Sequence, residues 1–402
     1  MRQRRRQLRQ EQQRGERAHP AQAAQQDTDD DQIEPAEKIQ HVLDGPKLGL
    51  GHPSGAADSP PASGLICMTC HDAAGHTGGH IVHSHFRPAW WLPGAHAQTL
   101  WGSLARRAPA ITELRLRRRR IELADGDFID LAVGAGDGPA VLIIHGLEGD
   151  LRSHYAGALV ARLAREGFKP VFMHLRGASE APNRLDRSYH SGASDDLAEV
   201  LDALAADAAG PPRTAVGFSL GGNLLLKYLG EGGRECHLNR AIAVSVPFVL
   251  RDAMLRLELG FSRIYRRHLV TRLKRTFNRK LKSRPWPAAL DPSLSLHAIR
   301  DFNTFDECIT APLNGFAGVF DYYQRASCRQ YLPHIHTPTL IIQAADDPFL
   351  FPASLPFAHE LGPGVTLELS PTGGHVGFVA GRWPWRPHYW LDERIIGALR
   401  QA

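Results

Sequence analysis

The sequence predicts an α/β fold in which helices flank a mostly parallel central sheet and a helical cap is inserted late in the chain. Three observations lead to this prediction. Short apolar runs typical of buried strands alternate with helical patterns from residue 140 onward. A Gly-x-Ser-x-Gly turn at 217–221 joins one such run to a helical pattern. Between about residues 247 and 332 the strand pattern stops, and amphipathic helix signals replace it.

Residues 1–85 differ in composition from the rest of the 402-residue chain. Gln, Arg, Asp, Pro, Gly and His dominate this segment, and its apolar residues show no periodicity. Such a segment cannot bury enough apolar surface to offset its chain entropy, so we predict a disordered, low-complexity N-terminal extension. Residues 86–402 are then expected to form one folded domain that includes the cap.

The extension contains the motif Cys67-Met-Thr-Cys70-His71, which has the spacing of a covalent haem attachment site. Further histidines follow at positions 76, 80, 83 and 85, so a zinc site is a second interpretation. Haem attachment requires export, and no folded scaffold is predicted around either ligand set. We therefore favour a dispensable extension, and we expect no metal and no cofactor.

Targeting signals and membrane spans are not evident in this sequence. Residues 1–9 lack the apolar segment of a secretory signal, and no run of 18 apolar residues occurs. The five cysteines are odd in number and scattered, which is typical of a reducing compartment rather than a disulfide scaffold. We expect a cytoplasmic protein.

Order is expected to begin near Phe86, because three tryptophans lie within residues 86–102. Aromatic residues at this density favour an N-terminal clamp packed on the core over a ligand platform. Two strand patterns follow at 113–123 and 127–133 around an Ala-Asp-Gly turn signal. The first contains four consecutive arginines at 117–120, which we interpret as a solvated edge strand rather than a nucleic-acid reader. We expect no nucleic-acid partner.

The remaining elements follow the alternating order that is typical of a parallel sheet. Buried strands are predicted at 140–144, 169–173, 213–216, 241–245, 338–342 and 365–369. Helices are predicted at about 152–166, at about 193–206, directly after the Gly-x-Ser-x-Gly turn, and between 391 and 400.

Ser219 is the candidate nucleophile, at the apex of a strand–turn–helix unit. The turn forces the serine into a strained conformation and needs small neighbours, which Gly217 and Gly221 supply. This geometry lifts the hydroxyl above the sheet edge. It also leaves the backbone N–H of Leu220 at a helix N-terminus, where it can bind a developing oxyanion.

A serine hydroxyl needs an adjacent base and an acid that orients the base, and the ends of parallel strands are where such groups collect. Asp347 follows the predicted strand 338–342, and His375 follows the strand 365–369. Asp346 is an alternative to Asp347 as the acid. The loop after the strand 140–144 is expected to supply a second oxyanion donor, the backbone N–H of Leu147.

The sequence resembles the YheT branch of the α/β-hydrolases. The resemblance rests on the segments 86–96, 97–100, 145–149, 176–177, 189–192, 217–223, 345–349 and 374–378, and it covers about residues 86 to 400. It implies the α/β-hydrolase fold and an esterase or lipase-like activity with the triad Ser219, Asp347 and His375. Relatives in the wider family act on medium-chain acyl esters and lipids, and the yeast members transfer acyl groups to alcohols.

The predicted cap contains a basic amphipathic helix. Apolar residues recur every four positions at 261, 265, 269, 273, 277 and 281, and arginines and lysines occupy most of the gaps. We favour a cap helix with a solvated basic face, and the alternative is peripheral contact with an anionic membrane.

The predicted reaction is hydrolysis of carboxylic esters, with short- to medium-chain acyl or lipid esters as substrates and an acyl-enzyme intermediate. Two alternatives stay open. An acyltransferase would pass the acyl group to an alcohol with the same triad, and a non-catalytic module would bind lipid or a partner on the same scaffold. The sequence makes no prediction of oligomeric state.

Overall fold

The computed structural model describes residues 78–106, 111–207 and 210–401, all within the unit formed by residues 69–402. The predicted disordered extension lies outside these residues except for its last part, and so does the Cys67–His71 motif. His80–His83 form a strand, β1, inside the segment that we predicted to be disordered. The predicted end of the disordered segment at residue 85 is therefore wrong, because His80–His83 are ordered. The cause is that β1 is stabilised by parallel pairing with a distant strand, which a local pattern does not reveal.

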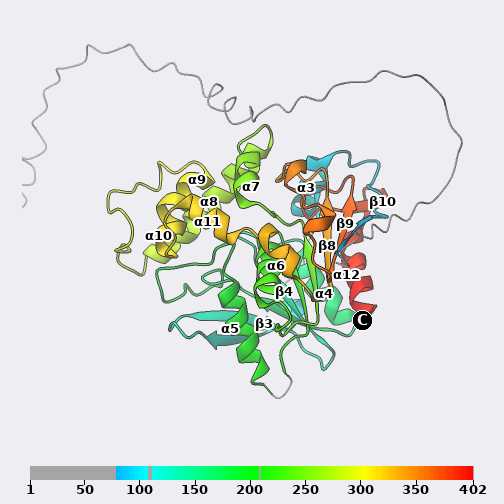
Figure 1. Cartoon of the computed structure of the whole chain (residues 1–402), viewed down its shortest axis with the longest axis horizontal. Helices are drawn as coiled ribbons and strands as arrows, with labels where there is room; N and C mark the ends of the chain where they lie inside the picture. Colours follow the sequence, from blue (N-terminus) through cyan, green and yellow to red (C-terminus); the bar gives the residue numbers. More distant parts are fainter. Residues whose placement is uncertain (1–77, 107–110, 208–209, 402) are drawn as a thin grey trace, which may run out of the picture. The chain divides into compact units, whose positions relative to one another are not determined.

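A nine-stranded sheet forms the centre of the fold, with the strand order β1-β9-β8-β7-β6-β4-β5-β3-β2 (Figure 1). Its other strands are β2 (Arg117–Glu122), β3 (Phe128–Val133), β4 (Ala140–Ile144), β5 (Lys169–Met173), β6 (Thr214–Phe218), β7 (Arg240–Val244), β8 (Thr339–Ala344) and β9 (Val365–Ser370). The pairs β2–β3 and β3–β5 are antiparallel, and the other pairs are parallel. The prediction of a mostly parallel sheet is confirmed.

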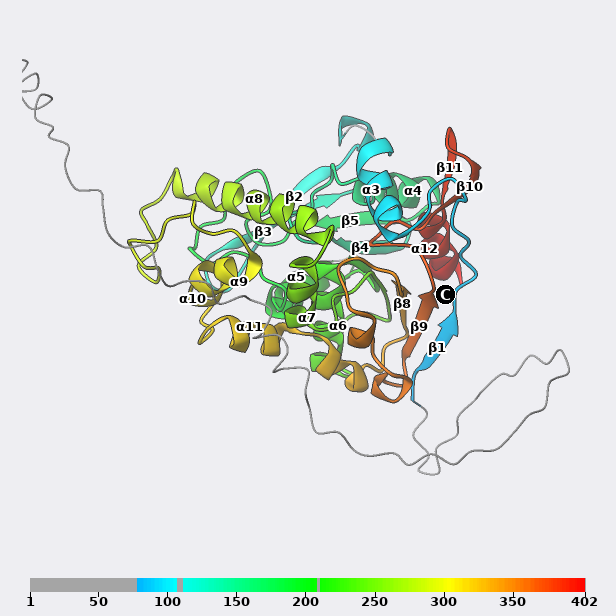
Figure 2. The same ribbon diagram turned by 90° about the horizontal axis from the view of Figure 1, so that it is seen from above.

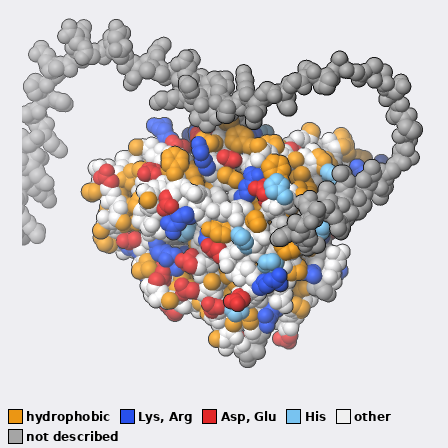
Figure 3. All heavy atoms as spheres, in the orientation of Figure 1, with side chains coloured by type: hydrophobic (Ala, Val, Ile, Leu, Met, Phe, Trp, Pro, Cys, Tyr) orange, Lys and Arg blue, Asp and Glu red, His pale blue; other side chains and the backbone are white. Residues whose placement is uncertain are grey.

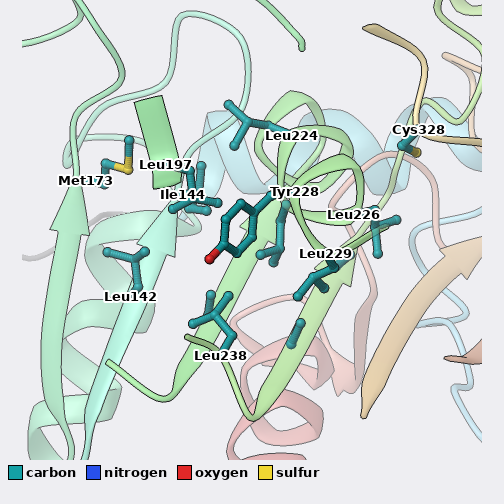
Figure 4. Packing of buried hydrophobic residues seen from close by; sticks show 14 of the residues in the cluster. Leu142, Ile144, Met173, Leu197, Leu224, Leu226, Tyr228, Leu229, Leu238 and Cys328 are labelled. Atoms are coloured by element: carbon teal, nitrogen blue, oxygen red, sulfur yellow. The ribbon is translucent and has the colours of Figure 1, made fainter. Parts of the chain in front are cut away.

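Helices cover both faces of this sheet because side chains along each strand point alternately to opposite faces. Leu142 and Ile144 of β4 belong to the apolar cluster that contains α5 (Ser194–Ala205) and α6 (Leu220–Gly232). Figure 4 shows part of this cluster, with Leu224 and Leu229 of α6. The intervening residues of β4 pack instead with α4 (Ala156–Arg165) and α12 (Trp390–Arg400). Both-sided burial explains why β4 reads as a continuous apolar run.

The cap consists of the elements between β7 and β8. They are α7 (Leu250–Leu257), α8 (Ser262–Leu281), α9 (Phe302–Phe305), the π-helical turn Asp306–Thr310, α10 (Ala311–Leu313), α11 (Val319–Ala326) and the 3-10 helix Arg329–His334. The cap has its own apolar cluster, which includes Leu257, Tyr265 and Phe277. The end of α8 is tied to the loop after β5, where Lys280 and Arg284 donate hydrogen bonds to backbone carbonyls.

The segment before β2 forms a helix, α3 (Ala95–Ala105), and packs against the hairpin of β10 (Val379–Trp383) and β11 (Arg386–Tyr389). Trp91 and Trp101 stack edge-to-face at 4.7 Å between ring centroids, as the aromatic clamp predicts. Trp90 does not belong to the clamp, because 72% of its surface is exposed. At the other edge of the sheet, β2 carries the four arginines, and Arg118 and Arg120 form ion pairs with Asp130 of β3.

Candidate active site

Ser219 lies between β6 and α6 in a left-handed backbone conformation, with φ 51° and ψ −117°. Its N–H donates to the carbonyl of Val244 at 2.8 Å, which fixes the turn against β7. A Cβ atom at Gly217 would lie 2.5 Å from the carbonyl oxygen of Gly221, and one at Gly221 would lie 2.5 Å from the carbonyl oxygen of Ile144. The turn therefore requires glycine at both positions. The strain is of the kind that concentrates at functional sites.

Two hydrogen bonds connect Ser219 to an acid through His375. The Ser219 Oγ lies 3.0 Å from His375 Nε2, and His375 Nδ1 lies 2.8 Å from Asp347 Oδ2. Asp347 is buried, and its carboxylate also accepts from the Phe349 N–H at 2.9 Å and from Gln343 Nε2 at 3.3 Å. With the proton on Nδ1, His375 has an acceptor at Nε2 that faces the serine hydroxyl. The structure thus brings the three predicted residues together in one chain of hydrogen bonds.

Asp346 has a different partner. Its Oδ1 accepts from the Gly374 N–H at 2.9 Å, and burial raises its pKa above the usual range of a carboxyl. Of the two aspartates that the sequence left open, Asp347 is the one that contacts His375.

Several residues that sequence reasoning gave no role hold His375 in place. Its N–H donates to the Thr99 Oγ1 of α3 at 2.9 Å, and the next N–H, at Val376, donates to the Ser245 Oγ at 2.9 Å. The Phe349 ring stacks on the imidazole with 4.0 Å between centroids and an angle of 1°. Ser245 and Val376 both have positive φ, at 53° and 55°. The segment 97–100, which is part of the family resemblance, is the signal that could have drawn attention to Thr99.

The loop after β4 lies directly against the serine, because a Cβ atom at Gly146 would be 3.2 Å from the Ser219 Cβ. The Gly146 N–H donates to the Tyr155 hydroxyl at 3.0 Å, and the Glu148 N–H donates to the Tyr189 hydroxyl at 2.8 Å. The Leu147 N–H lies between these two engaged amides. It is the remaining candidate of the three for an oxyanion donor.

His145 connects this loop to the backbone after β5. It is fully buried, and burial lowers its pKa to about 4, so the imidazole is neutral. Its Nδ1 lies 2.7 Å from the carbonyl oxygen of Gly146, and its Nε2 accepts from the Leu175 N–H at 3.1 Å. Both ring nitrogens are therefore engaged with backbone groups, which leaves no free nitrogen to act as a base.

A cavity of about 110 Å³ adjoins the serine and the imidazole, and side chains of the cap form most of its wall. Its apolar lining comes from α7, α8 and α9, with Leu250, Met254, Leu257, Leu269, Leu273, Phe277, Phe302 and Phe305. Leu147 and Leu220 lie at the end near Ser219. An apolar chain attached to a carbonyl that reacts at Ser219 would find apolar partners here.

Glu148 is a buried carboxylate in this wall, and sequence reasoning missed it. Its Oε1 accepts from the Tyr189 hydroxyl at 3.0 Å, and its Oε2 accepts from the Thr276 hydroxyl of α8 at 2.7 Å. Its carbonyl oxygen accepts from Arg272 of α8 at 2.6 Å. Glu148 also has a positive φ, at 53°. It therefore joins the loop that holds Leu147 to the longest cap helix.

Within residues 78–106, 111–207 and 210–401, no three His, Cys, Asp or Glu side chains are grouped so that they could hold a metal ion. No helix formed by these residues combines the length and apolar character that a membrane span requires.

The family model of the alpha/beta hydrolase fold matches residues 139–381. YheT of Escherichia coli (strain K12) is 40% identical over 318 residues, which cover 78% of this chain and 92% of that protein. Phospholipase ABHD3 of Mus musculus is 28% identical, and the match covers 80% of this chain and 79% of the phospholipase. The medium-chain fatty acid ethyl ester synthase/esterase 2 of Saccharomyces cerevisiae is 28% identical, over 66% of this chain and 63% of its own.

Proposed function

Because the chain belongs to the α/β-hydrolase fold family, in its YheT-type branch, we propose that it is a serine hydrolase that cleaves carboxylic esters. One observation supports this proposal most strongly. The Ser219 hydroxyl, the His375 imidazole and the Asp347 carboxylate form an unbroken path of hydrogen bonds beside an apolar cavity. The serine sits at the strained turn that serves this role in the family.

The proposed reaction proceeds in two steps. In the first, Ser219 Oγ attacks the ester carbonyl carbon while His375 Nε2 takes the hydroxyl proton. The tetrahedral intermediate collapses when the bond to the alcohol oxygen breaks, and His375 gives its proton to the departing alkoxide. In the second step, a water molecule attacks the acyl-enzyme with His375 as base, and the carboxylic acid leaves as the serine recovers its proton. Asp347 holds the proton-bearing Nδ1 and stabilises the imidazolium that forms in each step.

The developing oxyanion is proposed to accept hydrogen bonds from the N–H groups of Leu147 and Leu220. Leu220 is the first residue of α6, so its N–H lacks an acceptor within the helix and lies at the positive end of the helix dipole. The Leu147 N–H lies in the loop against Ser219, between two amides that tyrosine hydroxyls engage. Removing one oxyanion donor typically lowers kcat by about 100-fold to 1000-fold.

We propose short- to medium-chain acyl esters or lipid esters as the substrates. The apolar lining of the cavity supports this class, because it favours a hydrocarbon chain over a polar one. The names of two relatives, a phospholipase and a medium-chain fatty acid ethyl ester synthase/esterase, point to ester substrates of this kind.

Transfer of the acyl group to an alcohol is the second candidate, and the synthase named among the relatives favours it. An alcohol would replace water in the second step and the product would be a new ester. Product analysis by mass spectrometry with added ethanol separates the two reactions. Free acid alone identifies a hydrolase, and an ethyl ester in excess over the acid identifies a transferase.

Labelling with a fluorophosphonate probe tests the proposed function, because the probe reacts only with an activated serine. We expect wild type to be labelled, and we expect Ser219→Ala and His375→Ala to lose labelling. A panel of p-nitrophenyl esters should be hydrolysed by wild type alone. An unlabelled but well-folded wild type would contradict the proposal.

We also propose that α8 allows peripheral contact with an anionic membrane. Arg263, Arg267, Arg275 and Arg279 of α8 are exposed, and the apolar Phe261 and Ile264 lie exposed at its N-terminal end, beside Arg263 and Arg267. Figure 3 shows basic, acidic and apolar side chains interspersed on the face of the molecule that it draws. Charge and exposed apolar surface together are the features that attract a helix to anionic lipid.

Vesicle flotation tests this contact. We expect wild type to float with phosphatidylglycerol vesicles and not with phosphatidylcholine vesicles, and we expect Arg263→Glu with Arg267→Glu to abolish flotation. Arg115→Glu with Arg117→Glu is the matched control, because it makes the same change of charge at two exposed arginines within and just before the edge strand β2. Equal flotation of the double variant and wild type would reject the contact.

A further inference from the structure

We infer that Leu313 and Asn314, facing His190, close the far end of the catalytic cavity and set the longest apolar chain that the enzyme accepts. This inference deepens the proposed ester hydrolysis and rests on it. It concerns a part of the cap that takes no part in the chemistry at Ser219.

The first observation is that two cavities share one wall. The catalytic cavity of about 110 Å³ is lined by Ser219 and His375 among others, and a separate outer cleft of about 800 Å³ is lined by residues of α5, of α6 and of the cap. His190, Leu313 and Asn314 line both of them. The wall between the two spaces is therefore one layer of side chains at this point.

The second observation is the position of this wall. Leu313 ends α10, whereas Asp347 and His375 follow β8 and β9. In Figures 1 and 2, α9, α10 and α11 lie together on the side of the sheet away from β8, β9 and α12. A chain whose carbonyl reacts beside His375 and which extends through the cavity toward α10 would meet Leu313 there.

The third observation is a change of polarity across the wall. Leucine and phenylalanine side chains, most of them from the cap, are the most frequent residues in the lining of the catalytic cavity. The outer cleft is lined instead by charged residues, among them Arg187, Asp195, Lys227, Glu231 and Arg325. Methylene groups stay buried up to the wall and would face charged side chains and water beyond it. The wall is consequently both a steric stop and the end of the apolar environment.

His190 forms one side of this wall, and its position is fixed by its contacts. His190 is 8% exposed, and its Nδ1 accepts from the Gly192 N–H at 3.1 Å. Its ring packs edge-on against Phe316 and Tyr322, with centroids at 5.1 Å and 5.7 Å. Burial also lowers the pKa of His190 to about 3, so the ring stays neutral beside the apolar cavity.

Asn314 and Leu313 form the other side of the wall, and only Asn314 is held by a hydrogen bond. The Asn314 Nδ2 donates to the carbonyl oxygen of Thr310 at 2.8 Å, which ties Asn314 to the preceding helical turn. Leu313 has an apolar side chain that is only partly buried, so its contacts are dispersive. Removing the Leu313 side chain would open the catalytic cavity into the outer cleft without removing a hydrogen bond.

The test compares Leu313→Ala with Leu269→Ala. Leu269 is also a partly buried leucine of the catalytic cavity, but it does not line the outer cleft. Two substrate series are used, p-nitrophenyl esters of straight-chain acids from butyrate to palmitate and acetates of straight-chain alcohols from butanol to hexadecanol. For each variant the ratio of kcat/KM for the long esters to kcat/KM for the short ester is measured.

We expect Leu313→Ala to raise this ratio by about tenfold or more, since one or two methylenes that a pocket accepts or rejects change kcat/KM by about that factor. Leu269→Ala should widen the cavity and leave the length limit near that of wild type. Leu313→Phe should lower the ratio, and it provides a second arm if the alanine variant folds poorly. If the length limit changes in the acyl series, the acyl chain occupies the cavity. If it changes in the alcohol series, the alcohol chain does.

Identical length profiles for wild type, Leu313→Ala and Leu269→Ala would overturn the inference, provided that melting temperatures show folded variants. Fluorophosphonate labelling separates this result from a failure of the proposed function. If wild type is labelled and hydrolyses the short ester, the proposed function stands, and only the role of Leu313 in limiting chain length is rejected. If wild type is neither labelled nor active, the proposed function itself is rejected.

Discussion

The sheet and the cap contribute to the site in different ways. The residues at the strand ends are fixed by backbone features, since Ser219 has a strained φ and Asp347 accepts a backbone N–H. The cap is held by a separate apolar cluster and by side chains such as Lys280 that donate to loop carbonyls. Precise placement of reacting groups requires a rigid frame, whereas a chain-binding wall has only to exclude water and fit a shape. Changes at strand ends should therefore abolish the reaction, and changes in the cap should alter its selectivity or stability.

Ser219→Ala should produce the largest effect, because it removes the nucleophile and leaves the turn intact. We expect kcat/KM for p-nitrophenyl esters to fall by at least about 10⁴-fold. The melting temperature should stay close to that of wild type, since alanine and serine have similar backbone requirements at this turn. Substantial remaining turnover by the pure variant would show that the strand ends do not hold the reacting group.

Asp347→Asn and Asp346→Asn form a matched pair of neighbouring carboxylates. Asp347→Asn should lower kcat by about 10⁴-fold, because an amide no longer holds His375 in the tautomer that accepts at Nε2. Asp346→Asn should lower it by less than about tenfold, because its partner is the Gly374 N–H. Steady-state kinetics on one ester measures both. Equal losses would mean that the geometry around His375 does not distinguish the two acids.

Glu148→Ala tests the junction between the two regions. The change breaks the link from α8 to the loop that holds Leu147, and a small displacement of a reacting group can cost about 100-fold. We expect kcat to fall by about 10-fold to 100-fold with a smaller change in KM. Thr276→Val removes only one of the Glu148 partners and is the control, with little change in kcat expected. A loss confined to KM would assign Glu148 to substrate binding rather than to positioning.

Asp306 of the cap should have the smallest effect on the rate, and its effect is expected in stability. It is buried, and burial raises its pKa to about 6, while Thr310 and Tyr323 donate to its carboxyl. The folded state therefore binds more protons than the unfolded state between pH about 4 and 6, so this group makes the free energy of unfolding fall as pH rises through that window. The contribution is at most about 3 kcal/mol.

Urea unfolding at pH 4, 5, 6 and 7 measures this contribution as the difference between wild type and Asp306→Asn. We expect wild type to lose stability relative to the variant from pH 4 through pH 6, with a smaller further loss between pH 6 and pH 7. Parallel curves for the two proteins would show that Asp306 does not titrate in this window. The rate of ester hydrolysis at the pH of maximal activity should be similar in both.

The sequence predicted the central strands of the sheet well because they are buried on both faces. The predicted strand 365–369 differs from β9 by one residue, and 140–144 coincides with β4. The polar strand β1 escaped prediction because its stability comes from the pairing with β9 and from the hydrogen bond of Ser84 to Glu368. Neither contact leaves a periodic pattern in the local sequence.

The site was predictable to the extent that strand ends and turn glycines mark it. Ser219, Asp347 and His375 follow predicted strands, so the topology alone brings them near one another. Thr99 and Glu148 were not given roles, because they act through tertiary hydrogen bonds to His375 and to α8. The wall at Leu313 separates two cavities that only the folded chain forms, so the sequence could not reveal it.

Peptide mapping of the acylated protein tests the central claim most directly. Wild type is mixed with a p-nitrophenyl ester, quenched in acid within the first turnover, digested and analysed by mass spectrometry. The account predicts one acyl group on the peptide that contains Ser219, and none on that peptide from Ser219→Ala. Acyl groups on another residue, or burst release of nitrophenol with an unmodified Ser219 peptide, would contradict it.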